Sequence, residues 1–162
     1  IPFYLQQNSK QDFYRIWTNS KTVSNNYGAT IGLNYALLKR LNIGGNFTYA
    51  KLASQSLSDG LEDGFNTPRW IYNLYFSSPE IYKTLGFNIN FRQQSEFLWQ
   101  SALATGMVER YATLDFQVNA TFFKNSMNVK MGATNMLNSY YYSFIGGPAI
   151  GGFYYTSLTF GF

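Results

Sequence analysis

Residues 109–123, ERYATLDFQVNATFF, alternate between apolar and polar side chains for more than a dozen positions. The even positions from Ala112 to Phe122 are apolar, and the odd positions from Glu109 to Thr121 are polar or amphipathic. A period of two predicts a β-strand with one apolar and one wet face. Soluble strands usually hold this pattern for about five or six residues, whereas a tilted strand needs about 9 to 11 residues to cross a bilayer. The segment is therefore predicted to span a membrane.

The composition also indicates that something other than water surrounds much of the chain. Only 12% of its residues are charged, against about 25% in an average soluble domain. Aromatic residues make up 20% of the sequence, and they favour strands and membrane interfaces. No run approaches the roughly 18 apolar residues of a helical span. The cations are scattered and the net charge is only +4, which argues against nucleic-acid binding.

The sequence contains neither histidine nor cysteine. This removes the commonest general base, disulfides, thiolate metal sites and a cysteine nucleophile. Glu109 and Asp115 share a strand face, but six residues of strand separate them by about 20 Å, too far for two carboxylates to act on one bond. We therefore predict no enzyme activity, no metal site and no cofactor.

Six further segments alternate in the same way, namely 27–37, 41–49, 69–77, 85–96, 127–134 and 153–162. Residues 1–10 are expected to form a loop or a strand end, and residues 12–19 are extended but alternate poorly. Short turns are predicted near Lys39, Ser78 and Lys124, and long loops near Ser56, Ala104 and Gly146. Outer-membrane barrels have short periplasmic turns and longer extracellular loops. The predicted fold is therefore all-β, a transmembrane antiparallel β-barrel whose last strand runs toward the periplasm.

A soluble up-and-down barrel, as in lipocalins, is the alternative fold for this pattern. It would place the apolar faces inside and the polar faces in water. The polar faces here are rich in Asn, Gln, Thr and Gly and carry few charges. A water-exposed surface normally carries far more Lys and Glu, so the membrane barrel is favoured.

The C-terminal part carries motifs in a characteristic order. They run from Tyr111-Ala112-Thr113-Leu114-Asp115 through Gly132-Ala133-Thr134-Asn135-Met136-Leu137-Asn138 to Tyr141 and Gly151-Gly152-Phe153-Tyr154-Tyr155. This order resembles the end of a TonB-dependent outer-membrane transporter. In that family a Y-x-x-L-D strand precedes a G-x-x-N-L-x-N/D-x-x-Y strand and loop, and the last strand ends in an aromatic residue. Met136 replaces the usual Leu.

Upstream segments extend the resemblance over residues 12–162. Tyr27-Gly28-Ala29-Thr30 resembles the family's Y-G-x-E strand entry, with Thr30 in place of the acid. Asn46-Phe47-Thr48-Tyr49 is similar to its N-Y-T-Y strand. The loop IGGPAIGG most resembles members from Bacteroidetes-type bacteria.

The resemblance implies that residues 1–162 are one C-terminal barrel segment of a receptor for energised nutrient uptake in the Gram-negative outer membrane. Such barrels have about 22 strands and enclose a plug domain, which this segment lacks. The implied partners are the rest of the barrel and its plug, a TonB-type energising protein, the outer-membrane assembly machinery, lipid, and a surface lipoprotein or other complex subunits.

A complete eight-stranded barrel with an anchoring or adhesion role is the alternative reading. Its lumen would have to be filled by side chains. The inward positions here include Gly28, Gly32, Gly44, Gly86 and Gly132, which fill little space. This favours the segment of a wider barrel.

Charged and amide residues on the wet faces are the candidate functional residues. We expect eight of them to face the lumen: Arg69, Asn88, Arg92, Glu96, Glu109, Asp115, Gln117 and Lys130. The C-terminal assembly signal implied by the resemblance comprises Leu158, Phe160 and Phe162.

Overall fold

The computed structural model describes residues 3–7, 13–17, 21, 23–37, 40–53, 62–123 and 126–161. The expected turn residues Lys39 and Lys124, the loop residue Ser56 and the terminal Phe162 lie outside this set. The strands are β1 (Phe3–Gln7), β2 (Phe13–Trp17), β3 (Asn26–Leu37), β4 (Leu41–Leu52), β5 (Trp70–Tyr82), β6 (Leu85–Gln94), β7 (Phe97–Gln100), β8 (Thr105–Val108), β9 (Tyr111–Phe122), β10 (Met127–Thr134) and β11 (Phe153–Phe160).

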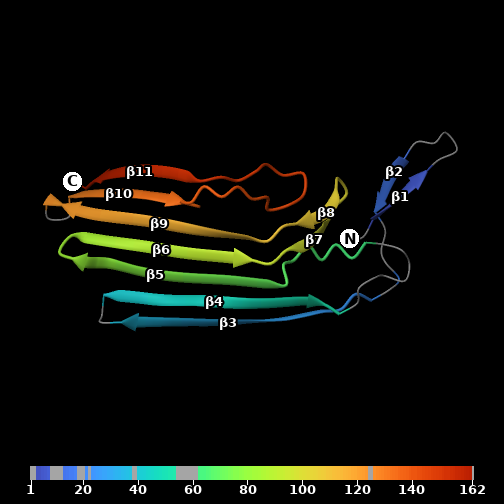
Figure 1. Cartoon of the computed structure of the whole chain (residues 1–162), viewed down its shortest axis with the longest axis horizontal. Coiled ribbons are helices and arrows are strands. Elements are labelled where there is room, and N and C mark those ends of the chain that lie inside the picture. Colours follow the sequence, from blue (N-terminus) through green and yellow to red (C-terminus); the bar gives the residue numbers. More distant parts are fainter. Residues whose placement is uncertain are drawn as a thin grey trace.

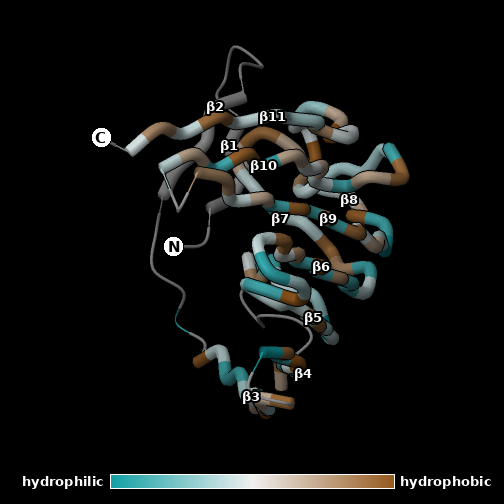
Figure 2. Tube along the Cα trace, turned by 90° about the vertical axis from the view of Figure 1, so that its left-hand side faces the viewer, coloured by the Kyte–Doolittle hydropathy of each residue, from teal (hydrophilic) through white to brown (hydrophobic). Residues whose placement is uncertain are grey.

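Seven strands form one antiparallel sheet in the order β11-β10-β9-β6-β5-β4-β3. Strands adjacent in this sheet are consecutive along the chain, except that the β7–β8 hairpin is inserted between β6 and β9 (Figure 1). Seen along the strands, the sheet follows an open arc (Figure 2). The predicted antiparallel all-β fold is confirmed, and β3 and β11 form the two edges of the arc.

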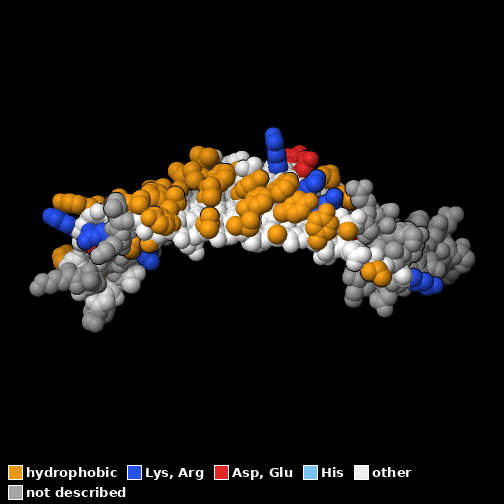
Figure 3. Space-filling model, turned by 90° about the horizontal axis from the view of Figure 1, so that it is seen from below, with side chains coloured by type: hydrophobic (Ala, Val, Ile, Leu, Met, Phe, Trp, Pro, Cys, Tyr) orange, Lys and Arg blue, Asp and Glu red, His pale blue; other side chains and the backbone are white. Residues whose placement is uncertain are grey.

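The register keeps the apolar positions of the seven strands on one face, hereafter the apolar face. One row of paired residues on this face contains Leu33, Gly45, Leu74, Phe91 and Leu114. Leu33 is 76% exposed and Leu74 is 58% exposed, although both lie in mid-strand. Hydrophobic side chains dominate the face seen in Figure 3, with most charged ones toward the ends of the strands. An exposed apolar surface of this extent marks a membrane or a partner as its environment.

The connections between the strands of the main sheet differ at its two ends. The connections from β3 to β4, β5 to β6 and β9 to β10 are short and lie at one end of the sheet, hereafter the turn end. Residues 62–69, 95–110 and 135–152 belong to longer connections at the opposite end, hereafter the loop end (Figure 1). Arg40 and Glu80 form an ion pair of 3.9 Å at the turn end. In the described part of the chain, no helix is long and apolar enough to cross a bilayer.

The turn predicted near Ser78 is wrong, because β5 continues through Ser78 and Pro79 to Tyr82. The register between β5 and β6 shifts between Ser78 and Tyr82, and the pairing of β5 with β4 ends at Ser77. Proline lacks an N–H, and a bulge with no ladder partner accommodates it. The chain reverses instead at Lys83, whose φ of 49° is left-handed.

Two other segments differ from expectation. Phe3–Gln7, expected as a loop or strand end, is strand β1 and pairs with β2 in a separate two-stranded sheet. The loop expected around Ala102 to Met107 includes β8, which pairs with β7 in the second small hairpin.

Candidate functional site

The long connections at the loop end contact one another through the β7–β8 hairpin. Asn66 Nδ2 donates to the carbonyl oxygen of Gln100 (2.8 Å), and the Gln100 N–H donates to Asn66 Oδ1 (2.7 Å). On the other side, the ring centroid of Trp99 lies 5.5 Å from that of Phe144. The hairpin therefore joins the connection before β5 to the connection after β10.

The connection from β10 to β11 is held by side chains from the motif region. The Asn135 N–H donates to Asp115 Oδ1 (2.8 Å), and Asn135 Nδ2 donates to the carbonyl oxygen of Ser139 (2.9 Å). Asn138 Oδ1 accepts from the Gly152 N–H (2.7 Å). Asn135 and Asn138 have φ values of 47° and 50°, a region that Asn enters more readily than most residues. These bonds hold the start of the loop on strand β9 and hold the two ends of the loop to each other.

A cavity of about 880 Å³ opens at this end, lined by residues 107–112, 137, 139–142 and 144–147. The rings of Tyr111 and Tyr141 stack within it, with centroids 4.0 Å apart. Glu109 and Arg110 are exposed and add one charge of each sign to the lining. Among the described residues, no group of His, Cys, Asp or Glu could hold a metal ion. The cavity can therefore offer aromatic stacking and polar contacts to a ligand.

The opposite side of the sheet, hereafter the polar face, is crossed by hydrogen bonds between strands. Asn73 Nδ2 donates to Asn46 Oδ1 (2.8 Å), and Arg92 Nε donates to Asn73 Oδ1 (3.1 Å). These bonds link β4, β5 and β6. They satisfy amide and guanidinium groups within the sheet itself.

Two tyrosines span a glycine on this face. Tyr75 donates to Asn34 Oδ1 (2.6 Å) across Gly44, which pairs with both residues. Tyr155 donates to Gln117 Oε1 (2.8 Å) across Gly132 in the same manner. A Cβ at either glycine would lie 2.6 Å from the tyrosine hydroxyl. Sequence reasoning did not select these tyrosines, although their position in the alternation placed them on the polar face.

Five of the expected lumen residues lie on the polar face by register: Asn88, Arg92, Asp115, Gln117 and Lys130. Asn88 pairs with Gln117. Asp115 accepts the hydrogen bond from the Asn135 N–H, and Gln117 accepts the one from the Tyr155 hydroxyl. Glu96 and Glu109 are exposed and lie beyond strand ends at the loop end, away from the hydrogen bonds that cross the polar face. Their role in a lumen stays a prediction.

Arg69 lies near two aromatic rings. Its guanidinium carbon lies 5.8 Å from the ring centroids of both Tyr49 and Trp70. These rings form a register pair on the apolar face. Arg69 directly precedes β5, and alternation does not fix side-chain direction beyond a strand end. Its guanidinium lies near these two rings of the apolar face, and its role in a lumen stays a prediction.

The sequence comparison identifies one family. Residues 3–157 match the model of the outer membrane protein beta-barrel family. No curated protein sequence matches the chain.

Two solved structures share the fold. The siderophore receptor PirA from Acinetobacter baumannii is 17% identical with a TM-score of 0.63, over 99% of this chain and 26% of that one. The siderophore receptor PiuA from the same organism is 17% identical with a TM-score of 0.59, over 85% of this chain and 20% of that one. This chain thus spans only about a fifth to a quarter of their length, and the resemblance to large transporter barrels is confirmed for the fold. The chain belongs to the outer membrane protein β-barrel family, and its location is the bacterial outer membrane.

Proposed function

We propose that this chain is the C-terminal barrel segment of a TonB-dependent outer-membrane receptor that takes up a nutrient by energised transport. The open arc carries this proposal, because β3 and β11 each have a single partner among the described strands. In lipid, an unpaired strand edge leaves N–H and C=O groups unsatisfied, so a spanning sheet must close. Further barrel strands would pair with both edges.

The polar face supports a wide lumen. Its Gly44 and Gly132 positions are bridged by tyrosines that lie across the sheet, and its amides bond to neighbours within the sheet. Because these polar side chains bond to neighbours within the sheet, they leave the lumen open to a plug domain in a barrel of about 22 strands. The plug would contact the TonB-type energising protein, as the sequence resemblance implies.

The loop end supports the receptor role. The packed loops and the cavity with the Tyr111–Tyr141 stack form a surface that can contact a ligand before it enters the lumen. PirA and PiuA are siderophore receptors, so siderophores are the first substrates to test.

The test begins with the intact mass of the polypeptide, isolated from its source outer membrane with an antibody against residues 135–152. We expect a mass several times the 18.5 kDa of this chain and retention on an immobilised periplasmic domain of TonB. Uptake of a radiolabelled siderophore panel should then require TonB. A mass near 18.5 kDa without TonB binding would replace the proposal with the small anchoring or adhesion barrel.

A further inference from the structure

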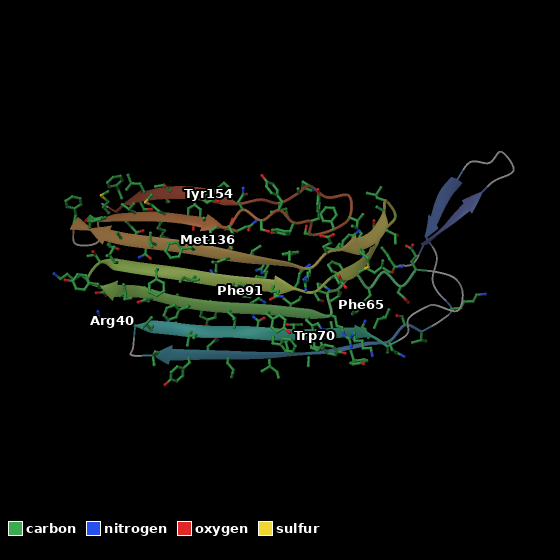
Figure 4. All side chains as sticks on the ribbon, viewed as in Figure 1. Arg40, Phe65, Trp70, Phe91, Met136 and Tyr154 are labelled. Carbon is green, nitrogen blue, oxygen red and sulfur yellow. The ribbon has the colours of Figure 1, made fainter. Side chains whose placement is uncertain are left out.

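An aromatic cluster lies on the apolar face at the loop end of β3, β4 and β5. The ring centroid of Tyr49 lies 4.5 Å from that of Trp70 and 6.3 Å from that of Tyr27. Phe47 continues the cluster, with its centroid 5.2 Å from Trp70. Tyrosine and tryptophan at the ends of spanning strands lie at the headgroup level of the bilayer. Figure 4 shows Trp70 at this end of the sheet and Arg40 at the other.

Two cations accompany these rings. The Arg69 guanidinium lies 5.8 Å from the centroids of both Tyr49 and Trp70 and is exposed. Lys51 pairs with Tyr27 in the register and alternates onto the same face as Tyr49. Both positive charges therefore lie beside rings that mark the lipid boundary, on the side that faces away from the lumen.

No described carboxylate lies within ion-pair distance of Lys51 or Arg69, since Arg40–Glu80 at the turn end is the ion pair found among the described residues. Cations at a membrane surface are attracted to anionic headgroups. A guanidinium also matches a phosphate through two parallel N–H donors, and stacking on rings holds its plane in place.

We propose that Lys51 and Arg69, supported by Tyr49 and Trp70, form a binding site for the phosphate of a lipid headgroup in the outer leaflet. Arg69 supplies paired donors and Lys51 a second positive charge. The rings contact the adjoining part of the lipid at the boundary. The site depends on the membrane position of the β-barrel and is independent of the proposed transport function.

The test uses the native full-length protein in phosphatidylcholine nanodiscs that contain a minor fraction of lipid A or of dephosphorylated lipid A. Bound lipid is counted by native mass spectrometry after release from the disc. The variant is Lys51→Gln with Arg69→Gln. Lys130→Gln, which removes one charge from the polar face, is the matched control.

We expect the wild type and Lys130→Gln to retain lipid A, and the double variant to lose about 30-fold in retention, from about 1 kcal/mol for each cation. The gel shift of the folded barrel on heating checks that each variant is assembled. Lys51→Gln with Arg69→Lys should retain more lipid A than the double Gln variant, because position 69 keeps its positive charge. Equal retention of the dephosphorylated lipid or an unchanged double variant would overturn the assignment.

Discussion

The replacement of Leu33 by Arg tests which face of the sheet contacts lipid. Leu33 is 76% exposed on the apolar face, and its partner on β4 is Gly45, which has no side chain to interact with an introduced charge. The aromatic Tyr27 lies six residues away on the same strand, about 20 Å at the rise of a strand. The nearer strand end, Leu37, lies four residues away, about 13 Å along the strand. The introduced charge still lies within the hydrocarbon, so we expect a cost of about 2 kcal/mol, the lower end of the midplane range.

Gly32 provides the matched control, because it is adjacent and faces the polar side. A Cβ there would make ordinary contacts of 3.7 Å, to the Asn46 Cβ and the Gly45 carbonyl oxygen. Gly32→Arg should therefore change the free energy of unfolding by about 0.5 kcal/mol or less. Leu33→Ala and Gly32→Ala correct for side-chain size and strand propensity.

The measurement is denaturant unfolding of the four variants of the native full-length protein, refolded into bilayers. The lipid-facing assignment requires Leu33→Arg to be less stable than Gly32→Arg by about 2 kcal/mol after the alanine correction. Equal destabilisation at the two positions, or a wild-type protein that stays monomeric without any amphiphile, would refute the reasoning.

Three further predictions follow from the loop end, the polar face and the last strand. Asp115→Ala removes the acceptor of the buried Asn135 N–H; it should cost about 1 to 3 kcal/mol and speed limited proteolysis within residues 135–152. Gly132→Ala should displace the Tyr155 hydroxyl, which lies 2.6 Å from the new Cβ, so Tyr155→Phe should lower the melting temperature in the wild type but not in the Gly132→Ala background. Deletion of Phe162 should leave most of the protein unassembled, measured as its abundance at the cell surface against that of the wild type.

The long strands and their faces could be predicted because alternation is a local property of the sequence. The register then carries this pattern across the sheet, as in the row from Leu33 to Leu114. Proline predicts a turn at Ser78, yet Pro79 lies in a bulge beyond the pairing of β5 with β4. A turn signal in the sequence does not reveal whether a neighbouring strand needs the missing N–H.

The β7–β8 hairpin could not be predicted, since four residues in each strand give no measurable alternation. Distant partners support it instead, through the Asn66 bonds to Gln100 and the contact of Trp99 with Phe144. The alternation of β5 predicts that Arg69 faces the lumen, but Arg69 precedes that strand and its guanidinium carbon lies 5.8 Å from the centroids of two rings. At both places, contacts between segments add to what the local pattern can predict.

The residues that carry the family resemblance form one physical unit. Asp115 ends the Y-x-x-L-D motif and accepts from Asn135, while Asn138 binds the N–H of Gly152 just before the last strand. The Met136 N–H also donates to the Leu114 carbonyl oxygen (2.7 Å). The spacing of the motif therefore encodes how the β10–β11 connection is anchored on β9. The loop residues between Asn138 and Gly152 are therefore held at the loop end whatever their side chains are. The lining of the cavity can vary while the strands that support it keep their register.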